Sequence, residues 1–185
     1  MRKSFDKGIV TPHPVFIIAT YDENGNADAM NAAWAGQVGP KEISISLSAH
    51  RTTENIKKNK EFTVSFATKE FVAASDYVGI VSADKVADKM EKSGFSVTKS
   101  DKVNAPVINE LPVAIECKVV SLTEEFNETR VVAEIVGMSA DESVLTEDKV
   151  DLAKLQPIMF DSSALAYREI GDIVGGAWDA GKKLM

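Results

Sequence analysis

Apolar and polar side chains alternate in several short runs of the chain. Between residues 42 and 48, Ile43, Ile45 and Leu47 alternate with three serines. This period of two predicts a strand with one apolar face and one small, polar face. By similar reasoning, strands are expected at 15–21, 28–34, 61–67, 111–122, 129–140, 158–160 and 164–168.

Turns and short helices are expected between these strands. Asn24-Gly25 is typical of a hairpin turn after the first strand. The two longest strands predict a long hairpin, joined by residues 123–127. Helices are expected at 53–60, 71–78, 83–92 and 151–155. The pattern therefore predicts a mostly β barrel with helical decoration.

The chain carries no internal repeat and no linker long enough to divide it. A single domain over residues 1–185 is therefore expected, with a core at about 9–171. The tail at 175–185 is expected either to be loosely held or to pack on a partner subunit through Trp178.

The bend at residues 48–55 combines hydroxyl groups with an arginine at the start of a predicted helix. Unpaired N–H groups and the positive end of the helix dipole favour an anion there, most often a phosphate. Thr52 or Thr53 is expected to be the N-cap, and the Arg51 guanidinium could reach the same anion. In the alternative reading, the threonines only cap the helix and Arg51 is solvated. We expect His50 to point to solvent.

The segment before this bend is built from small side chains around one large aromatic. Residues 31–36 read Asn-Ala-Ala-Trp-Ala-Gly. Small side chains let a flat ligand lie against the backbone, whose N–H and C=O groups can then bond its edge. Together with the phosphate bend, this segment resembles the flavin reductase-like family, whose fold is the FMN-binding split barrel, an antiparallel barrel of Greek-key type. Asn31, Trp34, Arg51 and Thr53 follow the family's order and spacing.

The resemblance covers roughly residues 9–171 and is closest to the flavoredoxin branch of the family. Residues 76–82 resemble its Gly-x-x-Ser turn, and Asp88-Lys89 its Asp-Lys pair. The resemblance implies FMN as cofactor, a phosphate held by Ser48, Arg51 and Thr53, and a homodimer with the flavin pocket at the subunit boundary. The cofactor-binding residues that it implies are Asn31, Ala32, Ala33, Trp34, Ser46, Leu47, Ser48, Arg51, Thr53, Asn55, Ser82, Lys89 and Phe160.

Two of these residues have a simpler interpretation. Lys89 lies in a charge-rich segment and can equally be an exposed helix residue. Phe160 can flank the flavin ring or belong to an ordinary strand core.

One position departs from the family pattern. Many members carry a His after the long hairpin, on the nicotinamide side of the flavin. Glu128 or Arg130 takes roughly that place here. The departure leaves the predicted FMN site intact but puts NAD(P)H-driven turnover in doubt, and no catalytic residue is assigned.

Composition excludes several other classes of protein. The net charge of −7 argues against nucleic-acid binding, which requires clustered Lys and Arg. A single cysteine, Cys117, excludes a disulfide framework and a thiolate metal site, and alternation predicts that it is buried. The chain has only two histidines, His13 and His50, and their positions do not predict a metal site. We expect no membrane span and no secretory signal, hence a cytoplasmic protein.

Three functions fit this interpretation. The first is an oxidoreductase that passes hydride from NAD(P)H to flavin. The second is an electron carrier of the flavoredoxin type that serves a protein redox partner. The third is a non-redox ligand-binding protein on the same barrel.

Overall fold

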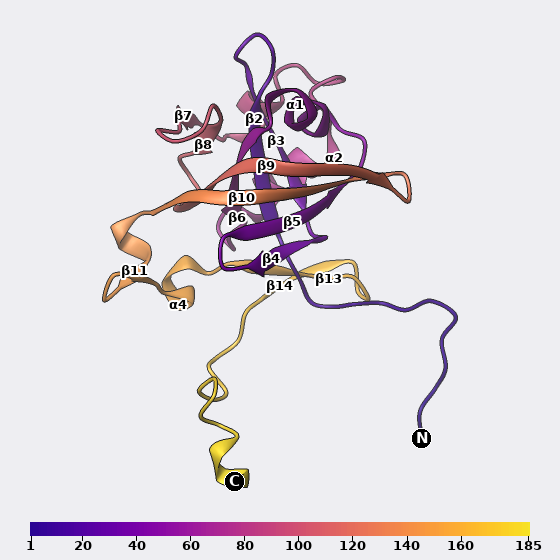
Figure 1. Cartoon of the computed structure of the whole chain (residues 1–185), viewed down its shortest axis with the longest axis vertical. Helices are drawn as coiled ribbons and strands as arrows, with labels where there is room; N and C mark the ends of the chain where they lie inside the picture. The colour runs from indigo at the N-terminus through magenta and orange to yellow at the C-terminus, as the bar shows by residue number, and fades with distance from the viewer.

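A computed structural model describes residues 1–185. Its main element is a seven-stranded antiparallel sheet that curls into a half-barrel (Figure 1). The strand order is β3 (Ala27–Ala32), β2 (Phe16–Tyr21), β6 (Glu61–Phe66), β9 (Val113–Glu125), β10 (Glu128–Ala140), β5 (Glu42–Leu47) and β4 (Ala35–Gly39). The two edge strands, β3 and β4, follow one another in the chain. Trp34 lies in the short connection between them, and its carbonyl oxygen accepts a hydrogen bond from Ser46 N of β5 at 2.8 Å.

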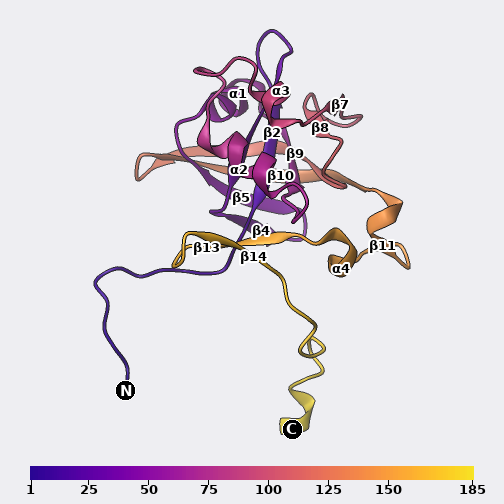
Figure 2. The ribbon, with the colours of Figure 1, turned by 180° about the vertical axis from the view of Figure 1, so that it is seen from behind.

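Helices and small sheets surround the barrel. The helices are α1 (Arg51–Asn59), α2 (Val72–Ile80), α3 (Lys89–Ser93) and α4 (Leu152–Leu155). Seen from behind, α2 and α3 lie against β3 (Figure 2). A three-stranded sheet joins β1 (His13–Pro14), β13 (Ile158–Asp161) and β14 (Ala166–Glu169). The remaining elements are β7 (Val97–Lys99), β8 (Pro106–Ile108), β11 (Leu145–Thr146), β12 (Lys149–Val150) and the 3-10 turns η1 (Glu142–Val144) and η2 (Lys182–Leu184).

Strand β2 separates two hydrophobic cores. Its side chains alternate, so that Phe16 and Ile18 pack in the barrel core with Ile45. Ile17 and Ala19 instead pack in the second core, with Val78 of α2. The apolar face predicted for 42–48 also lies in the barrel core, which leaves the serine side chains of β5 on its other face.

Cys117 is buried in the barrel core, as predicted. Burial is also the main reason why the pKa of its thiol rises to about 12.

The predicted helix at 83–92 is wrong, because only Lys89–Ser93 is helical. Ser82 and Asp84 bond each other through their side chains, and Ser82 Oγ also accepts from Asp84 N at 3.4 Å. Such local bonds compete with helix formation.

Two strand boundaries also differ from expectation. The strand predicted at 28–34 ends at Ala32, and a new strand, β4, starts at Ala35. The long hairpin is tighter than predicted, because Phe126 and Asn127 alone form its turn. Both residues have positive φ, at 53° and 64°, which matches the two-residue turn that the twist of a hairpin favours.

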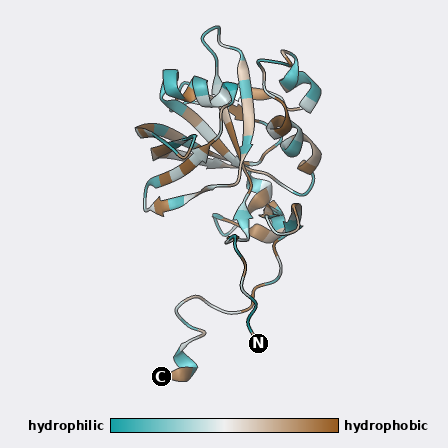
Figure 3. Cartoon of the chain, turned by 90° about the vertical axis from the view of Figure 1, so that its right-hand side faces the viewer, coloured by the Kyte–Doolittle hydropathy of each residue, from teal (hydrophilic) through white to brown (hydrophobic).

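Both termini leave the folded body on the same side (Figure 3). Residues 1–12 and 169–185 are exposed throughout. Trp178 is 96% exposed and Ile173 93% exposed, so neither packs within this chain. No helix is long and apolar enough to cross a membrane.

Candidate functional site

Helix α1, which follows the bend after β5, begins two residues earlier than predicted. The helix starts at Arg51, and His50 rather than a threonine occupies the N-cap position. Thr53 is buried, and its hydroxyl donates to Ser48 O at 2.8 Å. This bond ties the first turn of α1 to the end of β5.

Three more of the predicted cofactor-binding residues, one in the bend and two outside it, are occupied by structural contacts. Asn55 is buried, and its amide donates to Thr20 Oγ1 at 3.1 Å. Ser82 Oγ accepts from Arg51 N at 3.4 Å. Lys89 is 1% exposed, which excludes the simple interpretation of an exposed helix residue. Its Nζ lies 2.9 Å from Asp28 Oδ1 and also donates to Ala29 O.

His50 does not point to solvent as expected. Its Nε2 lies 3.1 Å from Val81 O, and its Nδ1 lies 3.2 Å from Thr52 Oγ1. The ring therefore links the start of α1 to the end of α2. Burial lowers the pKa of His50 and the charge of Lys89 lowers it further, while Asp28 acts in the opposite direction.

A cavity of about 250 Å³ opens beside this bend, between the edge of the barrel and the three-stranded sheet that contains β13 and β14. Eight residues of its wall belong to the site predicted from sequence: Asn31, Ala32, Ala33, Trp34, Ser46, Leu47, Ser48 and Phe160. Six more complete the wall: Val15, Met30, His50, Gly79, Glu128 and Tyr167. We call this cavity the aromatic pocket. Arg51, Thr53, Asn55, Ser82 and Lys89 do not line it.

Aromatic rings gather on one side of the aromatic pocket. The ring centroid of Phe160 lies 6.3 Å from that of Trp34 and 6.1 Å from that of Tyr167. His13 extends the group, 5.7 Å from Trp34. Trp34 stays 59% exposed, so this side of the pocket presents apolar surface to any ligand that enters.

A polar chain that includes the Tyr167 hydroxyl reaches from Asn31 of β3 to α2. Asn31 Nδ2 lies 3.3 Å from Ser75 O and 3.4 Å from the Tyr167 hydroxyl. That hydroxyl donates to Asp76 Oδ1 at 2.6 Å. Burial raises the pKa of Tyr167, and the Asp76 carboxylate raises it further, so the phenol stays protonated and holds the Asn31 side chain in place.

Glu128 is the only carboxylate in the wall of the aromatic pocket. It accepts a hydrogen bond from Ser46 Oγ at 2.5 Å. Arg130, the other residue considered for this place, pairs instead with Glu125 at 3.0 Å and is half exposed. The structure therefore puts Glu128, and not Arg130, in the wall of the pocket.

Arg51 lies outside the aromatic pocket, in an acidic setting. Its guanidinium is 3.2 Å from Asp84 Oδ1 and 3.8 Å from Asp22 Oδ2. Asp84 is 54% exposed, so this ion pair is of the weak, solvent-screened kind. An incoming phosphate can compete with Asp84 for the guanidinium.

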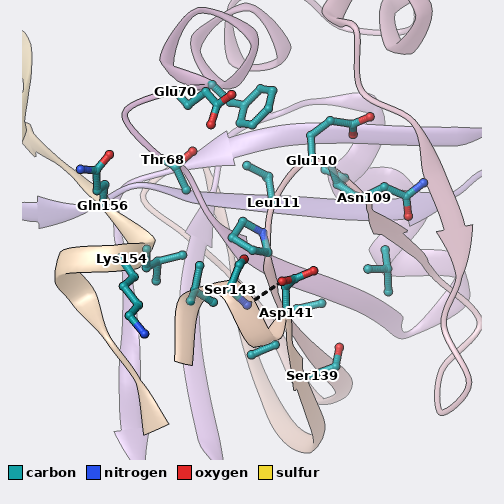
Figure 4. A pocket seen from close by; sticks show the side chains of 18 residues that line it. Thr68, Glu70, Asn109, Glu110, Leu111, Ser139, Asp141, Ser143, Lys154 and Gln156 are labelled. Carbon is teal, nitrogen blue, oxygen red and sulfur yellow. Dashed lines mark hydrogen bonds between the residues drawn. The ribbon is translucent and has the colours of Figure 1, made fainter. Parts of the chain in front are cut away.

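A larger cavity, of about 580 Å³, shares no residue with the aromatic pocket (Figure 4). It holds none of the residues predicted as a site. Asp141 accepts from Ser143 N at 2.8 Å and so caps η1, and Lys154 Nζ donates to Leu145 O. These two charged groups thus serve local turns, and the aromatic pocket remains the stronger candidate.

Comparison with known proteins identifies the family of the chain. The family model of the flavin reductase like domain matches residues 9–167. The chain belongs to this family. Flavoredoxin of Desulfovibrio vulgaris (Miyazaki F) is 33% identical, with a TM-score of 0.91 over 98% of this chain and 100% of its own.

Other solved structures also resemble this chain. Flavoredoxin from Methanosarcina acetivorans is 29% identical, with a TM-score of 0.91 over 100% of this chain and 99% of its own. A Shewanella frigidimarina protein, described as a flavin reductase with a split barrel domain, is 19% identical, with a TM-score of 0.75 over 89% and 85% of the two chains. This last likeness shows the fold alone. The split-barrel expectation is therefore confirmed.

Sequence reasoning missed several wall residues of the aromatic pocket. His50 was assigned to solvent, because its bond to Val81 joins segments 31 residues apart. Gly79 was noted only as part of the turn at 76–82, and Tyr167 only as part of the strand expected at 164–168. The Gly79 position is informative, because a Cβ atom there would overlap the amide of Asn31.

Proposed function

We propose that this chain is an FMN-binding flavoprotein that transfers electrons or hydride through its bound cofactor. The observation that carries the proposal is the composition of the aromatic pocket. Eight of the thirteen residues implied by the family resemblance line one cavity, although they come from β3, the β3–β4 turn, β5 with the residue after it, and β13. The two flavoredoxins that match over nearly the whole chain support FMN as the cofactor.

The residues present fit a flat, polar-edged ring. Ala32 and Ala33 have small side chains, so a ring can approach the backbone at this part of the wall. Trp34 and Phe160 supply aromatic surface, and the Asn31 amide supplies a polar group held in a fixed position. These residues would hold the ring and the ribityl chain.

The phosphate would lie toward the start of α1. Arg51 is the nearest arginine, and the free N–H groups of a nine-residue helix favour an anion there. Ser82 and Lys89 remain predicted contacts of the cofactor. In this structure, Ser82 Oγ accepts a hydrogen bond from Arg51 N, and Lys89 forms an ion pair with Asp28.

When bound, FMN supplies the redox chemistry. The chain contributes position and electrostatics. Glu128 places a carboxylate in the pocket wall where many family members have a His, and a carboxylate repels negative charge on the reduced ring. This departure favours an electron carrier, or a reductase with another donor, over a reductase driven by NAD(P)H.

Absorbance from 300 to 550 nm tests the proposal on purified protein, before and after anaerobic NADH or NADPH. Flavin bands that persist until dithionite is added would support the electron-carrier form. Bands that bleach with nucleotide would support a reductase. A colourless protein that does not take up added FMN would contradict both and would leave a non-redox function.

We also propose that the chain forms a homodimer. Both tails leave the same side of the body and expose large apolar side chains, among them Phe5, Ile173 and Trp178. A second copy would cover them, and burial of such surface stabilises association. Light scattering after size-exclusion chromatography measures the mass. A monomer at micromolar concentration would contradict the proposal, and a dimer that dissociates on removal of residues 172–185 would support it.

A further inference from the structure

His50 is the end of a buried chain of polar contacts that starts at Lys89. Lys89 Nζ lies 2.9 Å from Asp28 Oδ1. The other carboxylate oxygen, Oδ2, lies 2.8 Å from Thr52 Oγ1, which in turn lies 3.2 Å from His50 Nδ1. Asp28 and Lys89 are each 3% exposed or less, and Thr52 is fully buried. The chain therefore connects a buried ion pair to the wall of the aromatic pocket.

The number of hydrogens in this chain does not match its number of contacts when His50 is neutral. Val81 O can only accept, so His50 Nε2 must carry a hydrogen. A neutral ring then leaves Nδ1 bare, and the single Thr52 hydrogen must serve either Nδ1 or Asp28 Oδ2. Only a doubly protonated His50 satisfies all three contacts, because Nδ1 then donates to Thr52 and Thr52 donates to Asp28.

Opposing charges surround the ring. Lys89 from α3 and burial both favour neutral His50, while Asp28 from β3 and Asp84 from the loop after α2 favour the cation. Glu128 of β10 lines the same pocket and is the one carboxylate in its wall. No Lys or Arg lines the pocket, so His50 is the only residue of its wall that can become positively charged at neutral pH.

We propose that His50 takes up one proton from solvent when the anionic cofactor binds, so that Nδ1 donates to Thr52 Oγ1 while the Thr52 hydroxyl keeps donating to Asp28 Oδ2. The proposal rests on the proposed FMN function. In the free protein, the Thr52 hydroxyl donates to Asp28 Oδ2, so the 3.2 Å contact between neutral His50 Nδ1 and Thr52 Oγ1 has no hydrogen to share. In the complex, the negative charge of the cofactor stabilises the imidazolium, and the contacts from Lys89 to Val81 are then all satisfied.

Linkage gives this proposal a measurable sign. If the cofactor raises the pKa of His50, affinity for FMN is full below the pKa of the free protein. It falls as pH rises through the interval between the two values, by up to tenfold for each pH unit. Above the pKa of the complex, the affinity stays constant again.

Calorimetric titration of FMN into the cofactor-free protein tests the proposal. It is done at pH 8, in two buffers of different ionisation enthalpy, and gives the number of protons taken up. At pH 8 the FMN phosphate is already doubly charged, because its second pKa is about 6. The wild-type protein is expected to take up protons, and His50→Gln to take up fewer. A second readout is the NMR titration of His50 with and without FMN, assigned with His13→Gln.

Thr52→Val keeps the ring but removes the shared hydroxyl. It should lower the affinity for FMN and change the proton uptake, while a merely structural role of Thr52 would change stability alone. FMN binding with equal proton uptake in wild type and His50→Gln, and an unchanged His50 pKa, would overturn this inference and leave the proposed function standing. Absence of FMN binding in the wild type would overturn both.

Discussion

Gly79 of α2 packs directly on the side-chain amide of Asn31 of β3, and no room remains for a Cβ atom between them. This contact fixes where Asn31 lies in the aromatic pocket, together with its bonds to Ser75 O and the Tyr167 hydroxyl. A glycine with an ordinary backbone conformation is thus required at this position by close packing, because any larger residue displaces a pocket side chain.

Gly79→Ala should weaken FMN binding by displacing the Asn31 amide. Overpacking of this kind typically costs about 1–3 kcal/mol, which corresponds to roughly five- to a hundredfold in affinity if the cost falls on the complex. Gly36→Ala is the matched control, because a Cβ atom at Gly36 meets nothing within 4 Å. Quenching of flavin fluorescence gives the dissociation constants, and thermal unfolding shows whether the fold is intact. Equal dissociation constants for the two variants would contradict this role of Gly79.

Arg51 is expected to bind the FMN phosphate after it leaves Asp84. Arg51→Ala should weaken FMN binding by about 1.5–3 kcal/mol for each charge-assisted hydrogen bond that is lost. Asp84→Asn should leave the affinity unchanged or raise it a few fold, because the exposed pair with Arg51 contributes at most about 1 kcal/mol. Lys58→Ala on the same helix is the control for the loss of one positive charge, since Lys58 pairs with Glu23. A similar loss in the Lys58 and Arg51 variants would show that only overall charge matters.

The sequence pattern predicted the barrel strands well because each strand has a face in the core. The alternation at Ile43, Ile45 and Leu47 corresponds directly to buried side chains. The helix predicted at 83–92 was wrong, because the charged residues of this segment suggested a solvated helix. Lys89 is in fact buried against Asp28, 61 residues earlier in the chain. Contacts of such long range leave no local pattern, and the role of His50 was missed for the same reason.

Cys117 should make the fold less stable in alkaline solution. Its thiol keeps its proton up to a pKa of about 12 in the folded protein, against 9.0 as the ordinary value. The stabilising contribution is therefore fully present below pH 9 and is lost as pH rises from about 9 to 12, by at most about 1.4 kcal/mol for each pH unit. Urea unfolding at pH 8 and pH 10 should show a smaller loss of stability in Cys117→Ala than in the wild type. The same pH dependence in both proteins would contradict this expectation.

Glu128 should lower the reduction potential of the bound flavin. Its carboxylate lies in the wall of the aromatic pocket and accepts from Ser46 Oγ, and it repels the negative charge that reduction adds. Glu128→Gln keeps an oxygen for Ser46 and removes the charge, so the two-electron midpoint potential should rise by about 30 mV for each 1.4 kcal/mol of repulsion removed. Glu125→Gln on the same hairpin is the control, because Glu125 is exposed and pairs with Arg130. Spectroscopic titration against a reference dye measures both potentials. Equal shifts in the two variants would mean that the flavin responds to the net charge of the protein rather than to a carboxylate beside it.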